Sequence, residues 1–185
     1  CFASHVLNAW QEGTKIHFVT PEAKNNMFPF FPDVNDAPFN PMEGGRRLTD
    51  WTVDLASNGD EFDSVTRLTD TVSEFPRIDD RFTGVKNRYG WGLEMDMRRP
   101  VELKGGSAGG MLMNCLFLKD LEPGAEQPWW CGPTSTLQEP CFIPRSKDAP
   151  EGDGWIVQVC NRLDDAATDL LLFDALAIEK GPIAT

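Results

Sequence analysis

The chain has 185 residues, which fits one domain or part of a larger one, and its 41% hydrophobic and 25% charged residues are typical of a globular protein. Its formal net charge of −12 argues against a nucleic-acid partner, because phosphate backbones bind clusters of Lys and Arg. The sequence contains no run of about 18 apolar residues, so it predicts no membrane span. The presence of only two histidines excludes a metal site built from three or four histidines of this chain alone.

Short segments rich in β-branched and aromatic residues, bounded by turn residues, predict strands and little helix. In chain order the predicted strands are residues 4–11, 15–20, 46–54, 62–68, 88–95, 111–118, 154–161 and 168–175. The last has a continuous apolar centre, which is typical of a strand buried on both faces. Many short strands favour an all-β sandwich, barrel or propeller. At about 40–45 residues per propeller blade the chain would make roughly four blades, although no repeat of fixed period singles out the propeller.

The segments between these strands contain fewer residue patterns that predict secondary structure. Thr20 and Pro21 have the residue types of an N-cap and a first helical position, which predicts one helical turn over residues 21–27, and residues 175–179 are a second short helical candidate. The aromatic-rich segments 31–45 and 124–150 lack periodicity, so we expect ordered loops there. The glycine-rich segment at residues 105–110 predicts a flexible hairpin connection.

The five cysteines have irregular spacing and no Cys-x-x-Cys pair, which does not match a disulfide framework or a zinc site. Free thiols in a reducing cytosol fit better and predict a cytoplasmic protein, with a bridge between Cys131 and Cys141 left open. The chain begins without Met or a targeting sequence and ends soon after a predicted strand. We therefore expect it to be a segment of a longer protein.

Three side chains are candidates for a site. His5 lies in the apolar segment 2–10, which places its imidazole either in the core as a hydrogen-bonded residue or at a site as a metal ligand. Glu74 and Glu139 each lie close to a proline among apolar residues, where a buried carboxylate needs a partner. The ring N–H of a metal-bound histidine is one such partner, and a surface salt bridge is the other interpretation. His17 is interpreted as a strand or loop residue without a catalytic role.

Five motifs occur in a fixed order along nearly the whole chain. They are Ser-His-Val-Leu-Asn-Ala-Trp at 4–10, Asn-Asn-Met-Phe-Pro-Phe-Phe-Pro-Asp at 25–33, Ser-Glu-Phe-Pro-Arg-Ile-Asp-Asp at 73–80, Gln-Glu-Pro-Cys-Phe-Ile-Pro at 138–144 and Gly-Asp-Gly-Trp at 152–155. Together they make the chain similar to the carotenoid cleavage oxygenase family, and within it to the lignostilbene and stilbene dioxygenase branch. The second motif carries the preference for that branch.

The resemblance implies a seven-bladed β-propeller with an Fe(II) ion held on its axis by four histidines, three of them backed by glutamates. It implies O2-dependent cleavage of a C=C bond to two carbonyl products. The substrate would be a stilbene-type aromatic olefin, such as a lignostilbene or a resveratrol-like compound, or a carotenoid or apocarotenoid. Carried over by position, His5 matches an iron ligand, and Glu74 and Glu139 match two of the glutamates.

The resemblance also suggests where an aromatic substrate would bind, although a role in a packed core is the alternative. The candidate pocket walls are the aromatic residues Phe2, Phe28 and Phe30.

The other three histidines that the resemblance implies would lie outside residues 1–185. We therefore expect residues 1–185 to be a C-terminal portion of the propeller that misses the N-terminal blades and the final strand. Its partner would be the remainder of the propeller, and it would be inactive alone. One alternative is a catalytically inactive propeller module that binds a partner or an apolar ligand. Another is an unrelated all-β binding domain. This alternative would be favoured if His5 were exposed and remote from Glu74 and Glu139.

Overall fold

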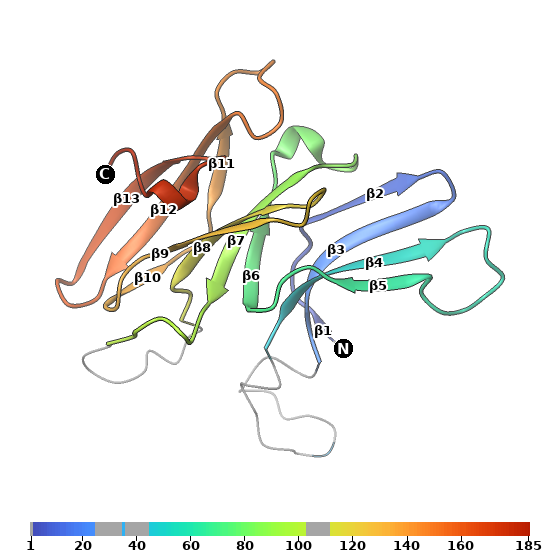
Figure 1. Ribbon diagram of the computed structural model, residues 1–185, viewed down its shortest axis with the longest axis horizontal. Helices are drawn as coiled ribbons and strands as arrows, with labels where there is room; N and C mark the ends of the chain where they lie inside the picture. The colour runs from blue at the N-terminus through green and yellow to red at the C-terminus, as the bar shows by residue number, and fades with distance from the viewer. Residues whose placement is uncertain (1, 25–34, 36–44, 103–111) are drawn as a thin grey trace. The chain divides into compact units, whose positions relative to one another are not determined.

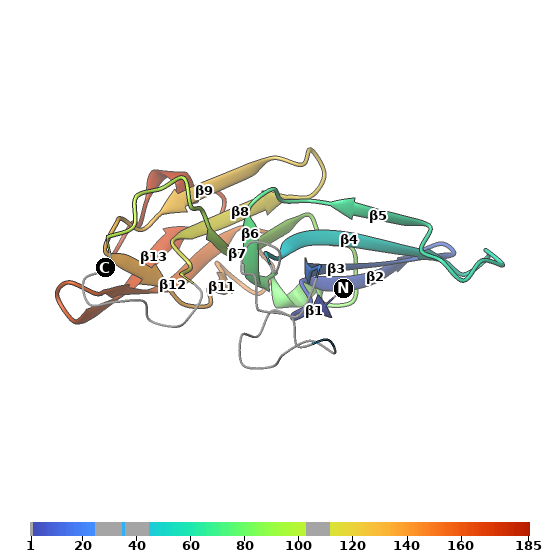
Figure 2. The ribbon, with the colours of Figure 1, turned by 90° about the horizontal axis from the view of Figure 1, so that it is seen from below.

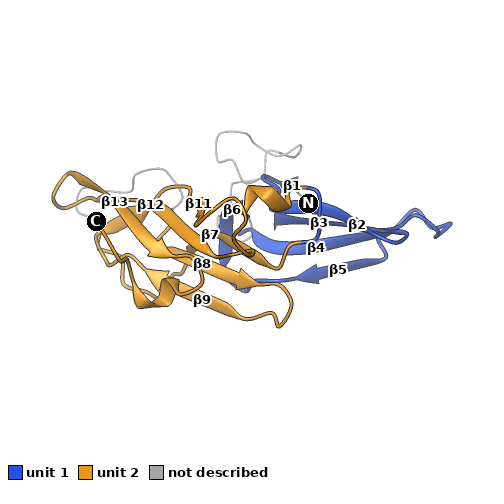
Figure 3. Cartoon of the chain, turned by 90° about the horizontal axis from the view of Figure 1, so that it is seen from above, with its two compact units in different colours: residues 1–74, 84–86 blue, residues 75–83, 87–185 orange. Residues whose placement is uncertain are grey.

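A computed structural model of the chain describes residues 2–24, 35, 45–102 and 112–185, and these residues form an all-β fold (Figure 1). The chain divides into two compact units (Figure 3). The first unit comprises residues 1–74 and 84–86, and the second comprises residues 75–83 and 87–185. The all-β class expected from the sequence is confirmed.

The first unit contains one antiparallel sheet of five strands, in which β1, β3, β4 and β5 follow one another and β2 also pairs with β3 (Figure 1). Because β4 pairs with β3 along nearly its whole length, β1 and β2 share the opposite edge of β3. The strands are β1 (Phe2–Ala3), β2 (Asn8–Glu12), β3 (Lys15–Ala23), β4 (Arg47–Asp54) and β5 (Ser64–Arg67).

The ladder along this edge of β3 is interrupted between β1 and β2. Ala3 pairs with Glu22 and Asn8 pairs with Val19, so the four residues 4–7 lie opposite only two residues of β3. The surplus forms a bulge, which bends a strand and re-aims the side chains that it carries. The bulge therefore takes residues 4–7 out of the regular alternation of the sheet.

This bulge corrects two predictions. The strand predicted over residues 4–11 begins only at Asn8, and His5 lies in the bulge before it. The helical turn predicted from Thr20 and Pro21 is wrong for these residues, because both continue β3 and pair with β4. Proline lacks a backbone N–H, so it is tolerated in a strand beside such an interruption of the ladder.

The second unit contains two antiparallel sheets, and β6 begins in the first unit and continues into the second. In one sheet the order is β6-β7-β8-β9, with β6 (Val72–Arg77), β7 (Tyr89–Met95), β8 (Cys115–Asp120) and β9 (Glu126–Trp130). In the other, β12 pairs with each of its neighbours, and the strands are β10 (Ser135–Leu137), β11 (Cys141–Pro144), β12 (Gly154–Arg162) and β13 (Ala167–Asp174).

Helix is confined to two short 3-10 turns in the described residues, η1 (Asp80–Phe82) and η2 (Ile178–Lys180). The second falls at the end of the helical candidate at residues 175–179. Within the part of the chain that the structure describes, no helix is long and apolar enough to cross a membrane.

The loop predicted over residues 124–150 is wrong, because this segment contains β9, β10 and β11. Among the described residues β9 is an edge strand, and an edge tolerates Pro128 because one side of the strand needs no ladder hydrogen bonds. The other two strands have only three and four residues. The segment 105–110, and residues 25–27 and most of 31–45, lie outside the described residues.

The core of the second unit lies between its two sheets, and Figure 2 shows their strands as two layers. Its largest side chain is Trp91 of β7, which is fully buried, donates from Nε1 to the Ala175 carbonyl at 2.8 Å and stacks on Phe142 at 4.8 Å between ring centroids. The strand predicted to be buried on both faces, β13, is half open, since Leu170 is 61% exposed. The inner strands β7 and β8 are the ones covered on both faces.

The described cysteines are free thiols, so the bridge between Cys131 and Cys141 that the sequence left open is not formed. Burial raises the pKa of the Cys115 thiol to about 12, and this thiol therefore stays protonated at neutral pH.

Gly154 is expected to be intolerant of any side chain. A Cβ atom on it would lie 2.3 Å from the carbonyl oxygen of Ile143 and 2.7 Å from the ring of Phe142, which stacks on Trp91. We expect Gly154→Ala to lower the free energy of unfolding by about 1–3 kcal/mol, the usual effect of overpacking, as measured by chemical denaturation. Gly59→Ala is the matched control, because its nearest neighbour is a movable hydroxyl at 3.3 Å. Equal midpoints for the two variants would contradict the expectation.

Candidate metal centre

The carboxylate of Glu74 is fixed by the way β6 begins. Ser73 N donates to the carbonyl of Arg46 at 3.0 Å, which joins the first residues of β6 to the chain just before β4. The Ser73 hydroxyl contacts the Thr69 hydroxyl at 2.7 Å, and Thr69 Oγ1 in turn accepts from Leu48 N at 3.0 Å. These bonds place the Glu74 side chain, which is fully buried, inside the first unit.

Three donor groups converge on one oxygen of that carboxylate. Glu74 Oε1 accepts from the Ser4 hydroxyl at 2.5 Å and from Nη1 of Arg46, and His5 Nδ1 lies 3.2 Å from it. Ser4 and His5 both come from the bulge between β1 and β2. The bulge and β6 thus bring together His5 and Glu74, which are 69 positions apart in the sequence.

The charges at this point balance as an ion pair. The Arg46 side chain is 1% exposed, and its guanidinium is the cation next to the buried carboxylate of Glu74. Burial lowers the pKa of Arg46, while the charge of Glu74 and the hydrogen bond to it oppose that change. The His5 side chain is 48% exposed, so its ring reaches from this buried pair toward solvent.

The arrangement of His5 fits one ligand of a metal ion. A metal-binding histidine commonly gives one ring N–H to a carboxylate, which orients the ring and leaves the other nitrogen for the metal. In His5 the nitrogen that faces Glu74 is Nδ1, so Nε2 would be the ligand atom. The described residues contain no group of three or more His, Cys, Asp and Glu side chains that could hold a metal ion.

Glu139 lies in the second unit, just before β11. Its carboxylate accepts from Arg77 Nη2 at 2.8 Å, and both side chains are 46% exposed. The second unit has no histidine, since both histidines of the chain belong to the first. This geometry is the surface salt bridge that the sequence left as one interpretation of Glu139, and its role behind an iron ligand stays a prediction.

The pocket residues expected from the resemblance are only partly described. Phe2 lies in β1, where it pairs with Ala23, and Phe28 and Phe30 lie outside the described residues. Their role at a substrate pocket stays a prediction.

His17 lies in β3 and has a structural environment. Its ring stacks on Trp10 of the neighbouring strand at 5.0 Å between centroids. Its Nδ1 lies 3.3 Å from Asp50 Oδ2 and 3.2 Å from Thr52 Oγ1. These contacts, all within one sheet, agree with the interpretation of His17 as a strand residue.

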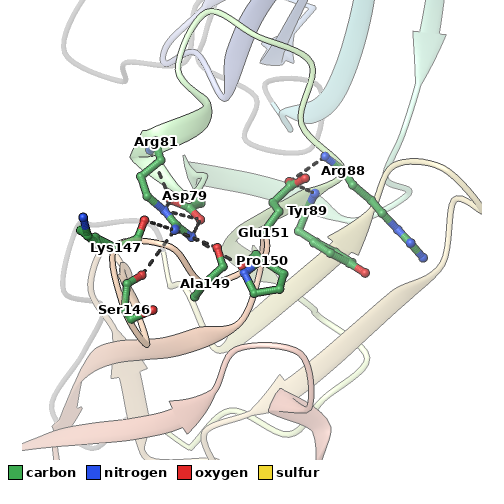
Figure 4. A network of polar contacts seen from close by, with 9 residues as sticks. All are labelled: Asp79, Arg81, Arg88, Tyr89, Ser146, Lys147, Ala149, Pro150 and Glu151. Carbon is green, nitrogen blue, oxygen red and sulfur yellow. Dashed lines mark hydrogen bonds and ion pairs between the residues drawn. The ribbon is translucent and has the colours of Figure 1, made fainter.

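A second cation organises the segment that follows Glu139 (Figure 4). Arg81 pairs with Asp79 and donates to backbone carbonyls of residues 146–150, in the connection between β11 and β12. Hydrogen bonding to Asp79 raises the pKa of Arg81. In the same connection Glu151 accepts from the backbone N–H groups of Arg88, just before β7, and Tyr89, its first residue, at 2.7 and 2.9 Å. The residues that follow Pro76 and the residues that precede Gly152 are thereby tied together within the second unit.

Arg46 and Ser4 are the site residues that the sequence did not indicate. The neighbouring pair Arg46-Arg47 has the pattern of an ordinary surface pair of basic residues. The available signal was the requirement that a carboxylate among apolar residues, here Glu74, needs a charged or hydrogen-bonding partner.

All of residues 1–185 match the family described as RPE65, retinal pigment epithelial membrane protein. The chain belongs to this family. It is the carotenoid cleavage oxygenase family that the order of the motifs indicates, which overturns the alternative of an unrelated all-β binding domain.

Curated relatives include enzymes named for aromatic substrates. Lignostilbene-alpha,beta-dioxygenase isozyme III of Sphingomonas paucimobilis is 50% identical over 182 residues, covering 98% of this chain and 37% of that protein. Isoeugenol monooxygenase of Pseudomonas nitroreducens is 40% identical, with coverage of 98% and 37%. The chain thus spans about 37% of the length of these relatives.

Solved structures of the family confirm the fold. Lignostilbene dioxygenase of Pseudomonas brassicacearum superimposes with a TM-score of 0.93 at 36% identity, over 99% of this chain and 38% of that one. Cobalt-substituted Synechocystis ACO gives a TM-score of 0.77 at 23% identity. The chain therefore has the fold of part of the carotenoid oxygenase propeller. Its described residues form three antiparallel sheets.

Proposed function

We propose that the complete protein carrying this chain is an Fe(II)-dependent oxygenase that cleaves the C=C bond of a phenolic stilbene-type olefin with O2. The reaction is R–CH=CH–R′ + O2 → R–CHO + R′–CHO, which balances without another reductant or oxidant. The observation that carries the proposal is the contact of 3.2 Å between His5 Nδ1 and the buried Glu74 carboxylate. It is the pairing expected for one ligand of a histidine-bound metal in this family.

The residues of this chain have defined roles in the proposal. His5 supplies one imidazole ligand through Nε2, and Glu74 fixes the ring by accepting a hydrogen bond from Nδ1–H. Glu139 would support a histidine from outside residues 1–185. When bound, Fe(II) supplies the activation of O2 for reaction with the olefin. Neutral imidazoles suit this metal, and the remaining ligands would come from the rest of the propeller.

The substrate class rests on the relatives. The names of two of them, lignostilbene dioxygenase and isoeugenol monooxygenase, denote compounds in which an alkene is conjugated to a phenol ring. The identity of 50% to the first of these favours a diaryl olefin over an apocarotenoid. Phe2, Phe28 and Phe30 are the proposed aromatic walls for such a flat substrate.

The test is oxygen consumption by the iron-loaded complete protein with 4-hydroxystilbene as substrate. We expect one O2 consumed per olefin and two aromatic aldehydes as products, identified by mass spectrometry. An apocarotenal is the comparison substrate, and faster turnover of the apocarotenal than of 4-hydroxystilbene would favour apocarotenoids as the substrate class. No oxygen uptake with either compound would contradict the proposed function and favour a catalytically inactive binding module.

A further inference from the structure

The ion pair between Arg46 and Glu74 is an unusual feature of the first unit. Both side chains are at most 1% exposed, and Nη1 of Arg46 donates to the same Oε1 atom that faces His5. A buried ion pair is weak support for stability, because apolar residues of similar volume often stabilise a fold as well. The contact that the pair makes with His5 therefore suggests a role beyond stability.

The pair determines which atom is the donor in the contact between His5 Nδ1 and Glu74 Oε1. A guanidinium has only donors, and Oε1 of Glu74 accepts from it and from the Ser4 hydroxyl. Because Oε1 accepts hydrogen bonds from both Arg46 and Ser4, it is an acceptor toward His5 as well. The donor in the contact with His5 is therefore Nδ1–H. Neutral imidazole carries one ring proton, which leaves the lone pair on Nε2.

The pair also fixes the orientation of the carboxylate. Nη1 of Arg46 donates to Oε1 of Glu74, and a charged donor holds a buried carboxylate more strongly than a neutral donor does. Ser4, adjacent to His5 in the bulge, approaches the same oxygen at 2.5 Å. The Ser73 N–H holds the Arg46 backbone at 3.0 Å, so the guanidinium and the carboxylate come from joined segments.

From these contacts we infer that Arg46 is a positioning residue of the metal centre. It acts through Glu74 Oε1 to hold the His5 imidazole in the Nδ1–H tautomer, with Nε2 left for the metal. This inference rests on the proposed function, because it concerns the same histidine.

The test measures cobalt(II) binding to the complete protein, because a cobalt-substituted relative exists and the visible bands of cobalt(II) report its ligand geometry. We expect Arg46→Met to raise the Kd for cobalt(II), measured by chelator competition, by about tenfold and to shift the visible bands. Arg46→Lys, which keeps a charged donor, should restore most of the affinity. Arg162→Met is the matched control, since the ion pairs described for Arg162 are with Asp165 and Asp169 of the second unit, and we expect this variant to bind cobalt(II) like wild type.

The cobalt(II) measurement distinguishes failure of the proposed function from failure of this inference. Wild-type protein that binds no cobalt or iron overturns the proposed function and this inference together. Wild-type binding with an unchanged Kd and unchanged bands in folded Arg46→Met overturns the inference alone. If Arg46→Met does not fold, Arg46→Gln keeps a neutral donor, and the inference requires it to weaken cobalt(II) binding by about threefold or more.

Discussion

Replacing Glu74 with glutamine is expected to lower the free energy of unfolding by about 3–5 kcal/mol, because it leaves the guanidinium of Arg46 buried without its counter-charge. In the complete protein the same change should weaken iron binding by about 10- to 100-fold, because His5 loses the carboxylate that accepts a hydrogen bond from its Nδ1–H. Chemical denaturation measures the first effect, and iron retention against a chelator measures the second.

A double variant separates the two effects. Arg46→Met with Glu74→Leu removes both buried charges, so it should recover most of the stability lost in Glu74→Gln. It should not recover iron binding, because His5 still lacks an acceptor. If Glu74→Gln has the same free energy of unfolding and the same iron affinity as wild type, the ion pair and its contact with His5 do not have the importance assigned to them.

The second large effect is expected at Trp91 in the core of the second unit. Trp91→Ala removes a fully buried indole, its stack on Phe142 and the donor to the Ala175 carbonyl. The free energy of unfolding should fall by about 3–5 kcal/mol, as for other buried large aromatic residues. The midpoint of chemical denaturation, followed by circular dichroism, measures it.

Two variants control for this result. Trp91→Phe keeps an aromatic ring against Phe142 and loses the hydrogen bond to Ala175, so its effect should be smaller. Trp155→Ala removes a partly exposed indole whose notable contact is Arg145, 4.5 Å from the ring centroid, and contacts of this kind contribute about 0.5–1 kcal/mol. A Trp91→Ala variant no less stable than Trp155→Ala would contradict the account of the core.

The strands that could be predicted are those whose sequence shows an apolar pattern. All eight predicted strands correspond to observed ones, with ends that differ by a few residues. The missed strands are short or interrupted by polar residues and proline, as in Val-Ser-Glu-Phe-Pro-Arg of β6. There the ladder and the buried contacts of Ser73 and Glu74 outweigh local propensity, which tertiary contacts commonly override.

The candidate site was predictable only in part. The motifs pointed to His5 and Glu74, and the structure brings these two together. The bulge that carries His5 could not be predicted, because it depends on the register of β1 and β2 along β3. Arg46 was missed for a different reason, since a basic residue before a strand gives no sign that its side chain is buried.

Iron content of the complete protein is the most direct test of the central claim that His5 is a metal ligand. We expect about one iron per protein in wild type and loss of most of it in His5→Ala. His17→Ala is the matched control, because His17 stacks on Trp10 within the sheet, and it should keep its iron. Equal iron content in the His5→Ala variant and wild type would contradict the account.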